Sequence, residues 1–253
     1  MITPRIIPCL LLKGLGLVKT VGFREPKYVG DPRNAVRIFN EKEADELLLL
    51  DITATLERRR PRFEMISDIA SECFMPFGYG GGICSLDDVR CILGIGAEKV
   101  VINTHALTDP GFVEKAAGLF GSQSIVVCLD VKRQRSGRYE VFVASGTKGT
   151  GTDAVAAAVQ MQHVGAGELI INSIDRDGTM AGYDLDLIRS ITQVVSIPVV
   201  ACGGAGTIQH LAEAIRQGGA SAAAAGSLFV FQGKHRAVLI SFPSEQDREA
   251  VFA

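Results

Sequence analysis

The sequence contains an internal repeat, and this repeat constrains the fold more than any other feature. Residues 9–13 read Cys-Leu-Leu-Leu-Lys and residues 128–132 read Cys-Leu-Asp-Val-Lys, each within a short apolar run typical of a buried strand. A second matching pair, Pro-Phe-Gly-Tyr-Gly-Gly-Gly at 76–82 and Pro-Val-Val-Ala-Cys-Gly-Gly at 198–204, lies at almost the same offset. The period is close to half of the chain, which is too long for a solenoid. We therefore expect two similar halves built on one plan.

The hydrophobic pattern predicts eight buried strands that alternate with helices. The apolar runs lack strict alternation and are mostly separated by stretches with helical spacing; they lie at 5–12, 46–52, 74–79, 98–103, 124–130, 167–173, 197–202 and 221–226. The chain has 253 residues, 47% of them hydrophobic, which is enough for one large core. We expect a single domain over 1–253, an α/β fold of the (β/α)8 TIM-barrel type with half-barrels at about 1–120 and 121–253. The stretches 13–31 and 132–152 are expected to be long loops.

Composition argues against several classes of partner. A net charge of −2 and a pI of about 6.1 give no reason to expect nucleic acid or an anionic membrane surface. No run reaches the 18 or more apolar residues of a membrane span and no basic leader precedes an apolar stretch, so we expect a cytoplasmic protein. The six cysteines lack paired spacing, which indicates reduced side chains that pack as small hydrophobes. We expect neither a metal site nor a cofactor.

In a (β/α)8 barrel the chemistry lies at the C-terminal ends of the strands, and here these ends are rich in glycine. Two glycine clusters, at 80–82 and 203–206, occupy equivalent positions in the two halves. Without Cβ atoms the backbone N–H groups can close on a phosphate, although one such cluster alone would more often be a tight turn. We predict two phosphate sites and a ligand with a phosphate at each end. The expected contacts are Gly81, Gly82, Asn103, Thr104, Gly203, Gly204, Gly226 and Ser227.

Carboxylates follow several predicted strands and are candidates for acid–base chemistry. Asp51 ends the second strand and Asp130 the fifth, while Asp175 and Asp177 lie in the turn after the sixth. Turns favour aspartate for local hydrogen bonding, so for Asp177 a structural role is at least as strong an interpretation. Asp130 is the best candidate because its neighbours are strand core and burial can raise the pKa of a carboxyl group. The repeat sets Leu11 against Asp130, so only one member of the duplicated pair can ionise.

Dense motifs extend from Arg5 to about Phe231. They include Arg-Ile-Ile-Pro-Cys-Leu from 5, Leu-Asp-Ile-Thr-Ala from 50, Gly-Gly-Gly-Ile from 80, Ser-Ile-Asp-Arg-Asp-Gly-Thr from 173 and Gly-Gly-Ala-Gly from 203. Through them the chain resembles the cyclase subunit of imidazole glycerol phosphate synthase. The resemblance implies a barrel that binds a substrate phosphorylated at both ends and forms a heterodimer with a glutaminase subunit, which supplies ammonia at the N-terminal face. The family's reaction closes an imidazole ring and releases an aminoimidazole carboxamide ribotide.

The resemblance also implies an aspartate pair at the ends of strands 1 and 5 as acid and base. Asp130 matches the second aspartate, but Leu11 stands at the position of the first. Lys19 matches a lysine of the family's strand 1 motif, and we count it with Asp51 and Asp175 among the other residues of the active face. Losing one member of an acid–base pair removes about 10²- to 10⁴-fold of rate, so we expect ordinary cyclase activity to be weak.

At the opposite end of the barrel the resemblance implies a charged gate for ammonia, built from an arginine, two glutamates and a lysine. The matching positions are Arg5, Glu46, Lys99 and Glu168, each near the start of a predicted strand. The alternative is that they are ordinary solvated charges. If they form exposed pairs at the rim, each pair contributes about 0.2 to 1 kcal/mol, and the gate opens at modest cost.

A retained gate without the aspartate pair resembles a paralogous branch associated with nucleotide-sugar amidation in surface polysaccharide synthesis. There a glutaminase and a barrel supply ammonia to a separate sugar amidotransferase. The first hypothesis is such a conduit, and the second is a working cyclase of histidine biosynthesis that tolerates Leu11. The stand-alone sugar isomerase of histidine synthesis fits less well, because it also requires an aspartate on strand 1. The arginine-rich run at 58–62 could attract an anionic sugar or an acidic partner, although a solvated loop explains it more simply.

Overall fold

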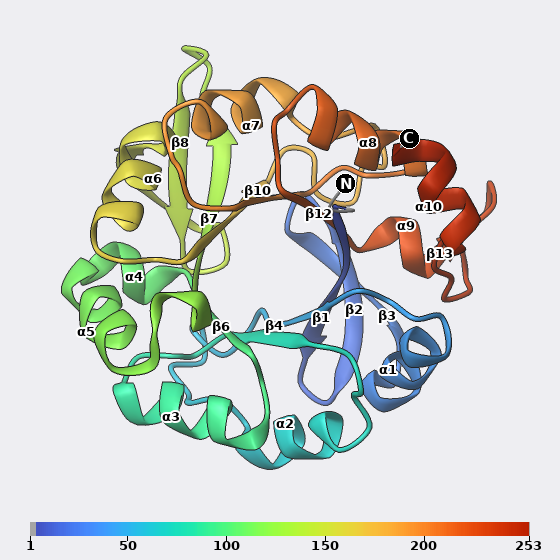
Figure 1. The fold of residues 1–253 in the computed structure, drawn as a ribbon, viewed down its shortest axis with the longest axis horizontal. Helices are drawn as coiled ribbons and strands as arrows, with labels where there is room; N and C mark the ends of the chain where they lie inside the picture. Colours follow the sequence, from blue (N-terminus) through green and yellow to red (C-terminus); the bar gives the residue numbers. More distant parts are fainter. Residues whose placement is uncertain (1–3, 253) are drawn as a thin grey trace.

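Eight parallel strands form a closed barrel in the computed structural model, which describes residues 4–252 (Figure 1). In ring order the strands are β1 (Arg5–Lys13), β4 (Leu47–Asp51), β5 (Phe77–Gly80), β6 (Lys99–Ile102), β7 (Ile125–Arg133), β10 (Glu168–Ser173), β11 (Val199–Cys202) and β12 (Ala222–Ala225). The ring is continuous because β7 pairs with β10 and β12 pairs with β1. Each predicted apolar run overlaps one of these strands, so the prediction of a (β/α)8 barrel is confirmed.

Helices follow the strands and form an outer ring around them (Figure 1). They are α1 (Pro32–Glu41), α2 (Phe63–Ala70), α3 (Leu86–Ile95), α4 (Thr104–Thr108), α5 (Pro110–Phe120), the 3-10 turn η1 (Ser122–Ser124), α6 (Ala154–His163), α7 (Leu185–Thr192), α8 (Ile208–Arg216) and α9 (Ser227–Val230). Side-chain caps determine where several of them begin; Ser85 and Asp88, for example, form a capping box at the start of α3. None of the helices within residues 4–252 is both long and apolar enough to span a bilayer.

The two stretches predicted as long loops are β-hairpins, so that prediction was wrong. β2 (Gly16–Val21) and β3 (Arg24–Gly30) form the first hairpin, and β8 (Tyr139–Val143) and β9 (Lys148–Asp153) form the second. β1 and β7 extend beyond the barrel and pair antiparallel with β2 and β8, respectively. The outer strands β3 and β9 are mostly exposed, so no apolar pattern reveals them. Both halves of the chain thus begin with the same unit, a nine-residue strand followed by a hairpin.

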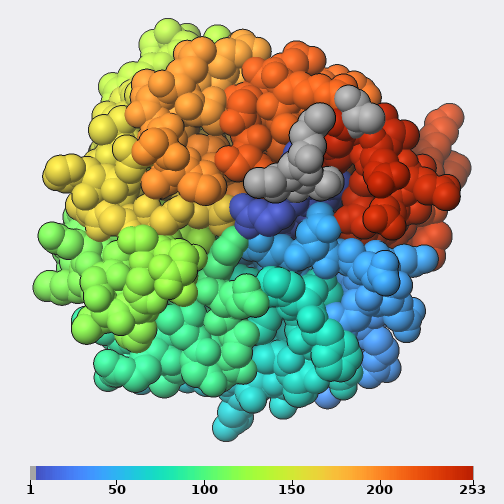
Figure 2. Space-filling model, viewed as in Figure 1, coloured from blue at the N-terminus to red at the C-terminus, as the bar shows by residue number. Residues whose placement is uncertain are grey.

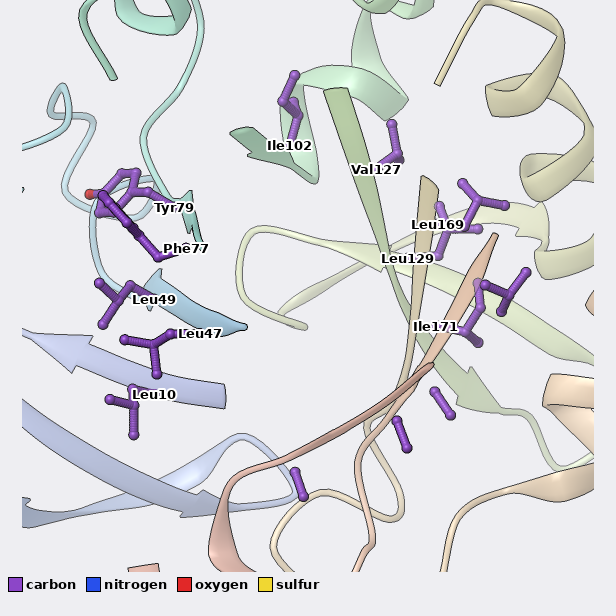
Figure 3. Packing of buried hydrophobic residues seen from close by; sticks show 14 of the residues in the cluster. Leu10, Leu47, Leu49, Phe77, Tyr79, Ile102, Val127, Leu129, Leu169 and Ile171 are labelled. Carbon is purple, nitrogen blue, oxygen red and sulfur yellow. The ribbon is translucent and has the colours of Figure 1, made fainter. Parts of the chain in front are cut away.

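Residues alternate along the barrel strands between two buried layers. Leu10, Leu49 and Leu129 belong to the large cluster packed between the strands and the helices, part of which Figure 3 shows. Their neighbours in sequence point the other way, and the smaller cluster inside the barrel includes Cys9, Leu48 and Cys128. The interior is therefore filled by side chains in layers, and a cavity can form only where these layers end.

The C-terminal segment packs beside the first strand and helix. It comprises a short hairpin of β13 (Phe231–Gln232) and β14 (Ala237–Val238), followed by α10 (Glu245–Phe252). Nη1 of Arg248 donates a hydrogen bond to Oδ1 of Asp45 at 2.7 Å, and Oδ2 of Asp45 accepts one from the backbone N–H of Ile6 at 2.9 Å. The early blue segment and the late red segment consequently lie side by side in Figure 2.

Candidate active site

A cavity of about 460 Å³ opens at the C-terminal ends of the strands. It brings together most of the residues that the sequence marks as functional, although they come from distant parts of the chain. These are Leu11, Lys19, Asp51, Gly81, Gly82, Asn103, Thr104, Asp130, Gly203, Gly204, Gly226 and Ser227. The volume matches a ligand of the size of a small metabolite, and the position is where barrels of this type hold their active sites.

Asp130 lies in the wall of this cavity and is only 8% exposed. Its Oδ1 accepts a hydrogen bond from Nδ2 of Asn172 at 2.9 Å, and its Oδ2 accepts one from Nδ2 of Asn103 at 3.3 Å. Burial raises the pKa of Asp130 to about 7, although the hydrogen bond from Asn172 opposes the shift. Both protonation states are therefore populated near neutral pH, as a group that takes and returns a proton requires.

Leu11 lies on β1, which stands opposite β7 in the ring. It pairs in register with Leu50 of β4, and both leucines line the cavity. The cavity thus has an apolar wall at Leu11, where the family resemblance implies an aspartate, and a titratable wall at Asp130. Because leucine carries no exchangeable proton, strands 1 and 5 of this barrel do not assemble an acid–base pair.

The two aspartates of the turn after β10 have different surroundings. Asp177 lines the cavity, and its Oδ2 accepts hydrogen bonds from Oγ1 of Thr20 at 2.7 Å and from the backbone N–H of Phe23 at 3.1 Å. Burial raises the pKa of Asp177. Asp175 is exposed, lies outside the cavity lining and accepts a hydrogen bond from the backbone N–H of Arg133 at 2.8 Å. Asp175 therefore lies after the C-terminal end of β10, on the face where the cavity opens, but only Asp177 reaches the cavity lining.

Asn172 and two cysteines of the cavity lining were missed in the sequence analysis. Asn172 is the penultimate residue of β10 and donates a hydrogen bond to Asp130, so a polar residue near the end of an apolar run was the available signal. Cys9 and Cys202 also line the cavity, and a hydrogen bond from the thiol of Cys202 lowers the pKa of Cys9. Nothing in the spacing of these cysteines indicates that their thiols face each other.

Lys19 projects from the first hairpin into the interior and is only 6% exposed. Its Nζ donates a hydrogen bond to the carbonyl oxygen of Cys9 at 2.5 Å, and burial lowers the pKa of Lys19. A Cβ atom on Gly226 would lie 2.1 Å from this Nζ, so the glycine makes room for the lysine. With one of three donors used by the described residues, Lys19 can offer the others to a ligand in the cavity.

Asp51 lines the cavity, but its carboxylate stabilises a turn. Oδ1 accepts hydrogen bonds from the backbone N–H groups of Thr53 and Ala54 at 3.1 and 3.2 Å. Both carboxylate oxygens also accept from Nη2 of Arg59 at 2.8 Å. Asp51 therefore holds the connection between β4 and α2 in place, with little capacity left for proton transfer.

The two glycine clusters permit close packing of backbone segments around the cavity. Gly82 has φ +73°, and a Cβ atom there would lie 2.5 Å from the carbonyl oxygen of Arg59. Gly204 has φ +116°, and its Cβ atom would lie 2.2 Å from the carbonyl oxygen of Gly182. Both positions therefore require glycine even without a ligand. A bulky residue at Gly204 would displace the backbone first, so that substitution cannot test anion binding.

The two hairpins meet at the edge of the cavity and form what we call the lid, residues 16–30 and 139–153. Besides the contacts of Asp177 described above, the backbone N–H of Gly22 donates to the carbonyl oxygen of Asp177 at 2.9 Å. Oγ of Ser145 donates to the carbonyl oxygen of Ile52 at 2.7 Å, and the backbone N–H of Ala144 donates to Oγ1 of Thr104 at 2.9 Å. Phe23 of the first hairpin lies so close to the second that a Cβ atom on Gly146 would be 2.7 Å from its ring.

At the other end of the barrel the four predicted gate residues form one network of ion pairs. Arg5 contacts both Glu46 and Glu168. Nζ of Lys99 lies 2.8 Å from Oε1 of Glu46 and 2.8 Å from Oε2 of Glu168. Both glutamates are only 6% exposed, so the energies of exposed rim pairs do not apply here, and that expectation is corrected. Just inside the network lies a cavity of about 10 Å³, large enough for one molecule of the size of water.

Comparisons with known proteins assign the chain to a family. A model of the family described as "Histidine biosynthesis protein" matches residues 5–236. A Pseudomonas aeruginosa protein provisionally named imidazole glycerol phosphate synthase subunit hisF2 is 52% identical over 243 residues, 96% of this chain and 97% of its own. A Leptospira borgpetersenii protein with the provisional name imidazole glycerol phosphate synthase subunit HisF is 48% identical over the full length of both chains. A Vibrio vulnificus protein, provisionally named subunit hisF3 of the same synthase, is 47% identical over 250 residues, 98% of this chain and 96% of its own. With its closed barrel and its cavity at the C-terminal ends of the strands, this chain belongs to the histidine biosynthesis protein family, as a relative of the cyclase subunit of imidazole glycerol phosphate synthase.

Proposed function

We propose that this barrel receives ammonia from a glutaminase subunit and delivers it for the amidation of a sugar. The observation that carries the proposal is Leu11, which gives the cavity an apolar wall opposite Asp130. A conduit needs an entrance and an exit for ammonia but no acid–base pair. The gate of Arg5, Glu46, Lys99 and Glu168 supports the entrance, and the names of the relatives, each a subunit of a synthase, support a partner protein.

The proposal includes a phosphorylated small-molecule ligand in the cavity. The backbone of Gly81, Gly82, Gly203 and Gly204, together with Asn103, Thr104, Gly226 and Ser227, lines the cavity and supports two anion sites. The donors of Lys19 that the described residues leave free provide a positive charge for an anion in the same cavity.

The alternative function is an active cyclase that makes imidazole glycerol phosphate. One observation favours it: Asp177 lines the same cavity as Asp130, so a second buried carboxyl group is present in the turn after β10. Asp177 is held by Thr20 and Phe23, however, and these contacts leave it less free to exchange protons.

One assay separates the two functions. The purified chain is given the bisphosphate substrate of the family and free ammonium, which bypasses any glutaminase, and the product is measured optically. We expect turnover lower by about 10²- to 10⁴-fold than for a barrel with both aspartates. The Leu11→Asp variant should recover part of that rate. Leu11→Asn should not, because its side-chain amide is polar but does not take or give a proton at neutral pH. Turnover of the unaltered chain equal to that of a two-aspartate barrel would establish the cyclase and reject the conduit.

A further inference from the structure

The arginine-rich run at 58–62 reaches the rim of the cavity, and neither proposed function makes use of it. The run lies in the connection between β4 and α2, where Arg58, Arg59 and Arg60 line the cavity and Arg62 does not. Arg60 is already committed, because its guanidinium pairs with Asp88 at 2.7 Å and lies 5.4 Å from the centre of the Phe63 ring. Arg60 thus anchors the run, and Arg58 and Arg59 remain to interact with a ligand at the rim of the cavity.

Arg59 has a donor without an acceptor. Its Nη2 contacts both oxygens of Asp51 at 2.8 Å, and its Nε donates to Oε2 of Glu57 at 2.5 Å. Its Nη1 is shielded from solvent and has no hydrogen-bond partner within residues 4–252. Leaving a buried charged donor unpaired costs about 1–3 kcal/mol or more, so native proteins nearly always provide an acceptor. Arg59 lines the cavity with the rest of its side chain, so an acceptor in the cavity reaches Nη1 when the guanidinium turns toward it.

Arg58 adds a second guanidinium without a partner. Arg58 is exposed to solvent at the rim of the cavity, and among the described residues no carboxylate lies within 4 Å of it and its side chain makes no hydrogen bond. Its φ of +51° is a backbone conformation that a long side chain rarely adopts, so the run is held in a specific shape. The same run packs directly on the first glycine cluster, because a Cβ atom on Gly82 would lie 2.5 Å from the carbonyl oxygen of Arg59 and 3.4 Å from the carbonyl carbon of Arg60.

We propose that Arg58 and Arg59 form an oxyanion site at the rim of the cavity beside Gly82, which binds a phosphate or the carboxylate of a sugar ligand. Guanidinium groups suit both oxyanions, because their planar donors match two oxygens at once. The site adds to the proposed function. It rests on that function in one respect, namely that its ligand occupies the same cavity. It makes the two ends of the cavity unlike, with arginines near Gly82 and a single lysine, Lys19, near Gly226. A ligand with two different acidic ends would therefore bind in one orientation.

The test follows two kinds of nuclear magnetic resonance signal during titration of the whole protein at constant ionic strength. The Nε–H signals of Arg58 and Arg59 report on the proposed site, and the amide signals of Gly81, Gly82, Gly203 and Gly204 report on the glycine clusters. Inorganic phosphate is the first probe and glucuronate the second. We expect the arginine signals to shift with at least one probe, and the responding probe distinguishes a phosphate from a sugar carboxylate.

Three variants sharpen the result. Arg58→Gln should weaken binding at the arginine signals by about 5- to 20-fold, as for the loss of a charge-assisted hydrogen bond. Arg59→Lys keeps a positive charge near Asp51 but removes the guanidinium, with Nη1 and the Nε contact with Glu57, and should also weaken binding. Arg62→Gln is the matched control, because it removes the same charge from the same run but lies outside the cavity lining, and should change the affinity less than about 2-fold.

The outcomes separate this site from the proposed function. If the Nε–H signals of Arg58 and Arg59 do not shift with either probe, Nη1 of Arg59 contacts only water and the site is rejected. Equal weakening in Arg58→Gln and Arg62→Gln would also reject it, because it would show general charge attraction. Arginine shifts without glycine shifts would support the oxyanion site and reject the phosphate clusters, whereas the reverse would retain the clusters alone.

Discussion

At the scale of single residues, two opposite walls give the cavity its chemistry. Leu11 and Leu50 continue the apolar interior of the barrel up to the cavity, as the proposed passage of neutral ammonia requires. Asp130 on the far wall is held by two asparagine amides and titrates close to neutral pH because it is buried. The carboxyl group can thus interact with a ligand in either protonation state, while the leucines can only exclude water.

The first prediction concerns the stability cost of the buried Asp130. Its pKa of about 7 in the folded protein lies above the value near 4 of an unfolded chain, so folding favours the protonated form. The resulting stability is fully present below about pH 4 and is lost as the pH rises through 7. Relative to Asp130→Asn, the unaltered chain should lose on the order of 3 kcal/mol of unfolding free energy between pH 4 and pH 8. Urea unfolding across this range measures the difference, and parallel profiles for the two proteins would show that Asp130 is not perturbed.

The second prediction concerns Ser227, whose hydroxyl lines the cavity without a hydrogen-bond partner among residues 4–252. If an anion binds there, Ser227→Ala removes one neutral hydrogen bond, which contributes about 0.5–1.5 kcal/mol. Calorimetric titration with inorganic phosphate should then show binding weaker by about 2- to 10-fold. The control is Ser221→Ala, because Ser221 is exposed and lies just before the start of β12, away from the cavity. Equal affinities for both variants would remove Ser227 from the site.

The correspondence between Leu11 and Asp130 could be predicted from the sequence, because the two positions align in the internal repeat. The choice between Asp175 and Asp177 could not, because the two share one turn and only the direction of each side chain separates them. The hydrogen bond of Thr20 to Asp177 joins residues far apart in the sequence, and no local pattern encodes such a contact. Asn172 lay within a correctly predicted strand, but its partner Asp130 became visible only when β7 and β10 were paired.

At the scale of secondary-structure elements, the lid hairpins are the parts that the hydrophobic pattern describes worst. The barrel strands are buried and therefore apolar, so their positions were predicted to within a few residues. The strands β3 and β9 pair on only one side and expose most of their side chains, so their stabilisation comes from backbone hydrogen bonds that carry no sequence signal. The two long segments between predicted strands, 13–31 and 132–152, nevertheless indicated where the two lid hairpins lie.

The third prediction tests how the first hairpin is held. Thr20→Val keeps the shape of the side chain but removes the hydrogen bond from Oγ1 to Asp177, which contributes about 0.5–1.5 kcal/mol. Amide hydrogen exchange at residues 16–30 should accelerate by about 2- to 10-fold if this bond limits local opening. Thr179→Val serves as the control, because its hydroxyl bonds only within its own turn, where it donates to the carbonyl oxygen of Arg176 and accepts from the backbone N–H of Ala181. Unchanged exchange in Thr20→Val would show that the backbone contacts alone hold the hairpin.

At the scale of the whole molecule, the barrel separates the charged network of Arg5, Glu46, Lys99 and Glu168 from the cavity at its other end. Between the two lie interior side chains such as Ile7, Val126 and Ile170, all buried and apolar. The identities of the gate residues could be read from the family resemblance, but their burial could not, because it depends on how four strand starts converge. This burial changes the energetics, since breaking a buried network is far more costly than breaking exposed pairs.

The fourth prediction concerns that network. Lys99→Leu leaves Glu46 and Glu168 with Arg5 as their one remaining cation, so one negative charge is uncompensated. We expect a loss of unfolding free energy of up to roughly 3–5 kcal/mol, to be measured by urea unfolding. In a system reconstituted with a glutaminase, glutamine-dependent transfer should fall more than ammonium-dependent transfer.

A double variant provides the control for this prediction. Lys99→Leu combined with Glu168→Gln restores neutrality and should recover most of the lost stability. If both nitrogen sources lose activity equally in Lys99→Leu, the network is structural and the conduit loses its entrance. Failure of any glutaminase to bind the barrel would count against the whole proposal.

The way the ring closes has a consequence for biosynthesis. β12 is the last barrel strand in the sequence, and it must pair with β1, the first. The ribosome adds about 5–20 residues per second, so β1 waits for roughly ten to forty seconds before its final neighbour exists. Throughout that time the nascent chain presents an open sheet edge and the apolar face destined for the interior. We therefore expect the growing chain to be a client of ribosome-associated chaperones until β12 has left the exit tunnel.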